Sequence, residues 1–144
     1  MKNLKNYVFL MLLFFPLAGK VGAQTHQTEQ PEKNKLAVLW STGDREVFTK
    51  MMYIYILNAK KQHWFDKVTV IVWGPSSRLL AGDKEVQSKI RQFEKAGVVM
   101  EACVWCADQY GVTETLRNLD VDVKGMGGLL TKYIKDPETE VLVF

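Results

Sequence analysis

Residues 97–111, GVVMEACVWCADQYG, combine a glycine, an apolar run and a polar segment that together decide the fold. Gly97 can end a helix, because glycine adopts the left-handed conformation at little steric cost. The apolar run 98–105 predicts a strand that is buried on both faces, as strands of parallel sheets are. The polar segment after it predicts a turn or short helix. Helix, buried strand and return to helix are typical of α/β domains.

The rest of the chain repeats this alternation on both sides of the quoted stretch. In order, we expect strand 36–40, a turn and N-cap at 41–44, helix 45–61, strand 68–73, turn 74–77, helix 83–96, strand 98–105, a short helix capped by Thr113, an extended piece at 121–123, a helix after Gly127 and Gly128 that continues through Tyr133, and strand 141–144. The sequence therefore predicts an α/β fold, a three-layer sandwich with a five-stranded, mainly parallel sheet flanked by helices. We expect one domain, at 35–144.

The first 23 residues have the layout of a secretory signal peptide. Two lysines precede the apolar run 7–18, and the small residues 21–23 follow it. The run is shorter than the roughly 20 residues of a membrane span, and Pro16 interrupts it. We therefore expect cleavage after Ala23 and no membrane attachment afterwards. No cysteine stands at the cleavage site to carry a lipid anchor.

The segment 24–34, QTHQTEQPEKN, is polar and contains a proline, so we expect a flexible leader there. The signal peptide predicts export, to the periplasm if the source is a bacterium. Both segments would precede the folded domain.

The formal charge of +3 comes entirely from the predicted signal peptide. The chain has 19 Lys and Arg against 16 Asp and Glu, and residues 1–23 contain three lysines and no acidic residue. Cleavage leaves 16 basic against 16 acidic residues. Because nonspecific nucleic-acid binding requires a basic surface, we expect no nucleic-acid partner.

The first predicted helix contains MMYIYIL at 51–57, which is apolar on nearly every side. Such a helix must be covered on more than one face, and the sheet covers only one. The other face meets either another subunit or a neighbouring helix of the same chain. Both alternatives stay open at this stage.

The chemistry is expected at Cys103 and Cys106, where the predicted third strand ends. Ligands and reactive groups collect at the carboxyl ends of parallel strands. A helix that begins there favours thiolate, and cysteines three apart in a helical turn can approach each other. Alternatively, Cys103 fills the core, or the pair forms a permanent disulfide. A metal site with Asp108 is disfavoured, because no second Cys/His pair exists, and we expect no metal.

Several short motifs, in order and with preserved spacing, resemble the DsrE/DsrF-like sulfur-relay family over 35–144. They are Val72-Trp73-Gly74-Pro75, Gly97-Val98, Ala102-Cys103-Val104-Trp105-Cys106-Ala107, Tyr110-Gly111-Val112 and Val141-Leu142-Val143-Phe144. The resemblance implies the family's order of strands and helices. It also implies a homo-oligomer, a trimer or hexamer, which would cover the apolar first helix.

The resemblance further implies a sulfur-transfer role. Cys103 stands eight residues before Gly111, the position that resembles the cysteine on which relay members carry sulfur as a persulfide. Cys106 is an additional thiol that some members share. No diffusible cofactor is implied, and the partners would be a sulfur donor and acceptor protein. Since the best-known members act in the cytoplasm, an exported member needs other partners.

Our leading hypothesis is an exported sulfur carrier that uses Cys103, with Cys106 able to resolve the persulfide. Loop residues at neighbouring strand ends are expected to line the pocket around the thiols, namely Thr42, Gly43, Asp44, Trp73, Gly74, Pro75 and Trp105. The alternative is a non-catalytic oligomeric binding module with a structural cysteine pair. A thiol-disulfide oxidoreductase has less support, because the CxxC pair of thioredoxin-like proteins conventionally follows the first strand.

Overall fold

Five parallel strands form the centre of the molecule, in the order β4-β3-β2-β1-β5. The computed structural model describes residues 32–144, so the predicted signal peptide and most of the leader lie outside the described residues. In chain order the elements are β1 (Lys35–Trp40), the π-helical segment η1 (Val47–Met52), α1 (Tyr53–Lys61), β2 (Lys67–Val72), α2 (Pro75–Gly82), α3 (Lys84–Ala96), β3 (Val99–Cys103), α4 (Val104–Gln109), α5 (Thr113–Arg117), β4 (Asp122–Lys124), α6 (Gly127–Lys135) and β5 (Thr139–Val143).

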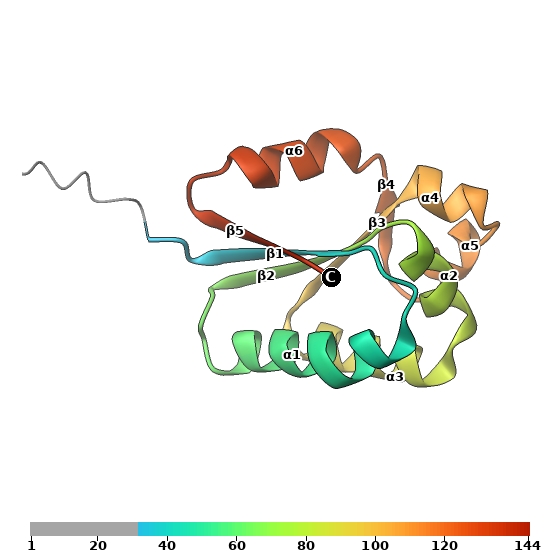
Figure 1. The fold of residues 1–144 in the computed structure, drawn as a ribbon, viewed down its shortest axis with the longest axis horizontal. Helices are drawn as coiled ribbons and strands as arrows, with labels where there is room; N and C mark the ends of the chain where they lie inside the picture. The colour runs from blue at the N-terminus through green and yellow to red at the C-terminus, as the bar shows by residue number, and fades with distance from the viewer. Residues whose placement is uncertain (1–31) are drawn as a thin grey trace, which may run out of the picture.

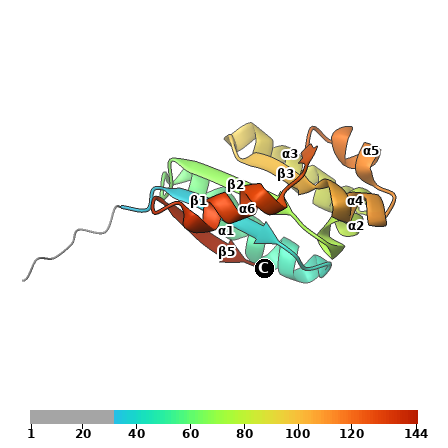
Figure 2. The same ribbon diagram turned by 90° about the horizontal axis from the view of Figure 1, so that it is seen from above.

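Helices cover both faces of the sheet, as the sequence predicts. Figure 1 shows α6 on one face and α1 with α3 on the other, while α2, α4 and α5 gather beyond the strand ends. Seen from above, α6 runs along the sheet over β1 and β2 (Figure 2). The α/β sandwich is therefore confirmed, and the sheet is parallel in every pair of strands within residues 32–144. None of the described helices is long and apolar enough to cross a membrane.

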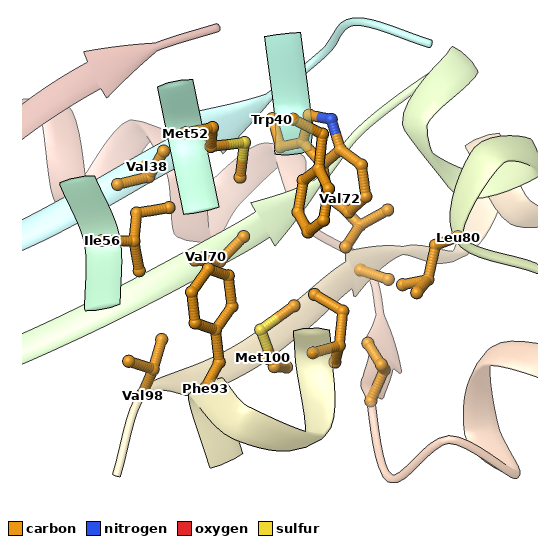
Figure 3. Close-up of a cluster of buried hydrophobic side chains, with 14 of the residues drawn as sticks. Val38, Trp40, Met52, Ile56, Val70, Val72, Leu80, Phe93, Val98 and Met100 are labelled. Carbon is orange, nitrogen blue, oxygen red and sulfur yellow. The ribbon is translucent and has the colours of Figure 1, made fainter. Parts of the chain in front are cut away.

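The larger hydrophobic core lies between the sheet and the layer of α1 and α3 (Figure 3). Trp40, at the end of β1, stacks on Phe48 with ring centroids 4.4 Å apart. Phe48 meets the edge of Phe93 from α3 at 6.3 Å. All three side chains are fully buried. Such aromatic pairs add about 0.5–1.5 kcal/mol beyond the burial of their surface, which ties both helices to the end of β1.

The helix boundaries follow from capping residues that the sequence contains. The Asp44 carboxylate accepts hydrogen bonds from the backbone N–H groups of Glu46 and Val47, at 2.7 and 3.0 Å, so the predicted cap of the first helix is confirmed. Gly97 ends α3 with φ of 83°, as predicted. Glycine suits this position because other residues adopt a positive φ at a cost.

The predicted strand 98–105 is wrong at its end, and the predicted turn 74–77 is wrong over 75–77, where a helix that was not predicted begins. β3 stops at Cys103, and Val104 and Trp105 begin α4. The predicted turn is largely the start of α2, which Pro75 opens at a helical position that needs no N–H donor. The predicted cap by Thr113 is also wrong, since its hydroxyl bonds Asp108 instead.

The first helix extends over 45–61 as predicted but contains π-helical turns. The N–H of Tyr53 bonds the carbonyl of Phe48, five residues earlier. The helix is only partly covered within the chain: Tyr53 stacks on Phe93 of α3, whereas Met51, Ile54 and Tyr55 are 57%, 50% and 36% exposed. A helix of the same chain therefore covers one flank and leaves another open.

Candidate functional site

Cys103 is the last residue of β3 and immediately precedes α4. Val72, the last residue of β2, lies opposite Ala102 of β3. Trp73 and Cys103 are the residues that follow this pair in the two segments. Because side chains alternate along a strand, Cys103 and Glu101 lie on the opposite face of the sheet from Ala102. This is the α6 face, where Cys103 packs in a small apolar cluster with Ala37, Ile71 and Met126, bordered by Leu39, Trp73, Cys106, Leu129, Leu130, Tyr133 and Val141.

Both cysteines are free, and they differ in exposure. Cys103 is buried, with 3% of its surface exposed, whereas Cys106 is partly exposed. Burial and a hydrogen bond with Cys103 raise the pKa of the Cys106 thiol above its ordinary value. The expectation that this junction favours thiolate is therefore wrong for Cys106, because burial outweighs the favourable backbone groups.

Gly74 contributes directly to the thiol pair. Its backbone N–H hydrogen-bonds the sulfur of Cys106, which acts to lower the pKa of this thiol and partly offsets burial. Gly74 has φ of 64° and ψ of −131°, a combination that is essentially restricted to glycine. The position of this donor therefore depends on a glycine after β2, one of the predicted pocket residues.

The other predicted pocket residues do not gather around the thiols as a group. Trp73 borders the apolar cluster of Cys103, as predicted. Thr42 and Asp44 serve the helix start: the Thr42 hydroxyl accepts a hydrogen bond from the Asp44 N–H at 3.0 Å. Gly43 and Pro75 pack together and line a separate hollow of about 220 Å³ with Arg78, Leu79, Gly82 and Asp83, to which neither cysteine contributes.

Trp105 does not enclose the thiols. It lies in the first turn of α4 between the two cysteines, and 74% of its surface is exposed. Nearby, the guanidinium of Arg78 lies 5.5 Å from the centre of the Tyr110 ring, which links α2 to the residue after α4. Trp105 is thus a surface aromatic beside the pair, and the sequence alone gives no sign of which way it faces.

A polar network on the α6 face was not predicted from the sequence. The Glu101 side chain, 9% exposed, accepts a hydrogen bond from the Lys124 ammonium at 2.9 Å and another from the Tyr133 hydroxyl at 3.2 Å. Lys124 also pairs with Asp122, and Tyr133 with Thr69. The sequence holds one signal of this network: Glu101 is a carboxylate within an otherwise apolar strand, and a buried charge needs partners.

This network fixes α6 to the sheet close to Cys103. Lys124 lies opposite Cys103 in the pairing of β4 with β3. The two carboxylates raise the pKa of Lys124, and burial with the nearby charge of Glu101 raises the pKa of Tyr133. Both groups therefore keep their protons at neutral pH. Within residues 32–144 no three His, Cys, Asp or Glu side chains come together as a metal-binding group.

Comparisons with known proteins agree with this architecture. The sequence model of the DsrE/DsrF-like family matches residues 34–144. A conserved protein of unknown function, BT1422 from Bacteroides thetaiotaomicron, is 35% identical with a TM-score of 0.74, over 77% of this chain and 95% of that one. The ychN protein from E. coli shares the fold, with 17% identity and a TM-score of 0.59, over 78% and 99% of the two chains. No curated protein matches the sequence.

Proposed function

The chain belongs to the DsrE/DsrF-like family, and from this membership we propose that it is an exported sulfur-transfer protein that holds sulfane sulfur as a persulfide on Cys103. One observation carries the proposal: two free thiols interact at the carboxyl end of a parallel strand, where α/β folds place their reactive groups. No diffusible cofactor is needed. Export rests on residues 1–23, which lie outside the described residues.

The reaction is a transfer of sulfur between thiols. A cysteine thiolate attacks the sulfane sulfur of a polysulfide or donor persulfide. A new S–S bond forms on the cysteine, the S–S bond of the donor breaks, and the donor leaves with one sulfur fewer, as a shorter polysulfide or as a thiolate. No oxidant is required, because one S–S bond forms for each one that breaks and the transferred sulfur keeps its oxidation level. The apolar cluster around Cys103 supports storage, since it limits the access of water and external thiols to the persulfide.

Polysulfide loading followed by mass spectrometry tests the proposal. The reduced protein is treated with sodium tetrasulfide, excess reagent is removed, and free thiols are alkylated before peptide fragmentation. We expect a product heavier by one sulfur atom, with that sulfur on Cys103. Protein that gains no sulfur on Cys103 under these conditions would contradict the carrier role.

We also propose that the protein is a homo-oligomer, a trimer or hexamer. The exposed apolar side of the first helix, formed by η1 and α1, supports this. Met51 of η1 is 57% exposed and Ile54 of α1 is 50% exposed. Tyr55 lies against the exposed Trp64, with ring centroids 6.0 Å apart. A contiguous apolar surface of this kind is typical of a contact between proteins. The sulfur donor and acceptor would be further proteins in the compartment to which this protein is exported.

The same exposed surface supports a second candidate, an oligomeric binding module of this fold whose cysteines are structural. Native thiol titration separates the two functions. Thiols that react in the native protein and load sulfur support the carrier, whereas a disulfide that resists mild reductant supports the module. Insulin reduction would instead support a thiol-disulfide oxidoreductase.

A further inference from the structure

We propose that Cys106 is the thiol that first receives sulfur from the donor and that it then passes the sulfur to Cys103. This inference rests on the proposed function and assigns an order to the two cysteines. Cys106 would be the receiving thiol and Cys103 the storage thiol. The three observations that carry it are the difference in exposure, the contact between the thiols, and the backbone donor at Gly74.

Exposure favours Cys106 as the receiving thiol. Cys103 is 3% exposed and surrounded by apolar side chains from β1, β2 and α6, so a donor cannot reach its sulfur in this conformation. Cys106 is partly exposed, in the helix that also carries the exposed Trp105. Reactive cysteines are typically partly exposed, because an external reactant must reach the sulfur. A donor therefore meets Cys106 first.

The raised pKa of Cys106 works against this order and slows the receiving step. A higher pKa leaves less thiolate at neutral pH, yet each thiolate is a better nucleophile. Together these effects slow attack by about threefold for each unit by which the pKa exceeds the ambient pH. The titratable group that faces Cys106 is Cys103, and the Gly74 N–H opposes its effect. The order rests on access: a donor can reach the partly exposed Cys106 sulfur, whereas the Cys103 sulfur is buried.

The contact between the thiols supplies the second step. Once Cys106 carries the persulfide, the Cys103 thiolate attacks the outer sulfur, a new S–S bond forms on Cys103, and the bond to the Cys106 sulfur breaks. Cys106 leaves as a thiolate and takes up the proton that Cys103 gave up, so the exchange consumes neither base nor oxidant. The Gly74 N–H hydrogen-bonds the Cys106 sulfur and so stabilises the leaving thiolate.

Time-resolved loading with sodium tetrasulfide tests the order. In the wild-type protein we expect sulfur on Cys106 first and on Cys103 later. Cys106→Ser keeps a small polar side chain beside Gly74, and we expect it to slow the loading of Cys103 by at least about tenfold. Cys103→Ser removes the second acceptor, so sulfur should accumulate on Cys106. Circular dichroism checks that both variants fold, and Cys106→Ala serves as a second variant.

The outcomes separate this inference from the function on which it rests. If wild-type protein takes no sulfur on Cys103, whether or not Cys106 is loaded, the proposed function itself fails. If wild-type protein and Cys106→Ser load Cys103 at the same rate, the carrier role stands and the order proposed here is overturned. Cys103→Ser that takes no sulfur on Cys106 would also overturn it.

Discussion

Gly74 shows how a single residue can connect the fold to the thiol pair. Its positive φ lets the chain leave β2 and enter α2 directly, and the same conformation directs its N–H to the Cys106 sulfur. Two residues later, the buried Ser76 hydroxyl donates to the carbonyl of Trp40 at 2.6 Å and accepts from the Trp73 N–H at 2.9 Å. The ends of β1 and β2 are thereby fixed beside the candidate site.

We predict that Gly74→Ala lowers the free energy of unfolding by about 1–3 kcal/mol, the usual cost of such a backbone conformation in a non-glycine residue. No atom lies within 4 Å of the added methyl group, so the effect comes from the backbone alone. Urea unfolding measures it.

Gly125→Ala is the matched control for Gly74→Ala. Its added methyl group also meets nothing within 4 Å, but Gly125 does not have a positive φ. We expect its stability to be unchanged or higher by up to about 1 kcal/mol. Equal stability of the two variants would contradict the role of the Gly74 backbone.

At the scale of elements, α3 illustrates how a capping residue fixes a helix and ties it to another segment. The Asp83 carboxylate accepts hydrogen bonds from the N–H groups of Glu85 and Val86, at 2.8 and 3.0 Å. Arg45, in the first helix, donates to the same carboxylate at 2.7 Å. The hydrogen bond from the Val86 N–H holds the pKa of Asp83 below its ordinary value. The Arg45 guanidinium and the backbone N–H of Glu85 lower this pKa further.

We predict that Asp83→Ala lowers the free energy of unfolding by about 1 kcal/mol at neutral pH. Because the folded pKa is lowered, the charge contributes stability above the unfolded pKa, whose reference value is 3.8, and loses it as pH falls through the folded pKa. The difference from wild type should therefore shrink in acid. Urea unfolding at neutral and acidic pH measures it.

Asp83→Asn separates the cap from the charge. Its amide oxygen still accepts the N–H groups of the first turn, so it should keep much of the capping at neutral pH and show a weaker pH dependence than Asp83. If Asp83→Ala were as stable as wild type at neutral pH, the cap would contribute nothing.

For the whole molecule, the distribution of apolar surface is uneven. Helices cover both faces of the sheet (Figure 1), yet Ile54 and Tyr55 of α1 remain 50% and 36% exposed, and no further helix within residues 32–144 covers them. The network of Glu101, Lys124 and Tyr133 instead closes the opposite face under α6. These features make the α1 side the surface that we expect between subunits.

We predict that Ile54→Glu shifts the protein to a smaller assembly in light scattering, because a buried, unpaired charge is unfavourable at an apolar interface. Ile134→Glu is the matched control: Ile134 is 62% exposed but lies on α6, across the sheet from α1. The control should keep the wild-type mass. A wild-type protein that is already monomeric would contradict the prediction.

The amino-acid sequence was enough to predict the α/β class, a mainly parallel sheet of buried strands, the bounds of the two longest helices and the place of the cysteine pair. These follow from local information: apolar runs such as 36–40, the cap at Asp44, and the helix stop at Gly97. The match to a known family over 34–144 agrees with this part. Hydrophobic periodicity records which residues are buried, and for strands of a parallel sheet that is nearly sufficient.

Which cysteine is accessible, and what surrounds it, depends on the packing of the whole chain. That β3 ends at Cys103, that Gly74 meets Cys106, and that Glu101 pairs with Lys124 and Tyr133 all depend on strand register and on segments far apart in the chain. Periodicity contains no information on such pairings, because it specifies a buried face without naming the residue that covers it. The greater exposure of Cys106, from which we infer that it meets a donor before Cys103, likewise follows from the packing of the chain.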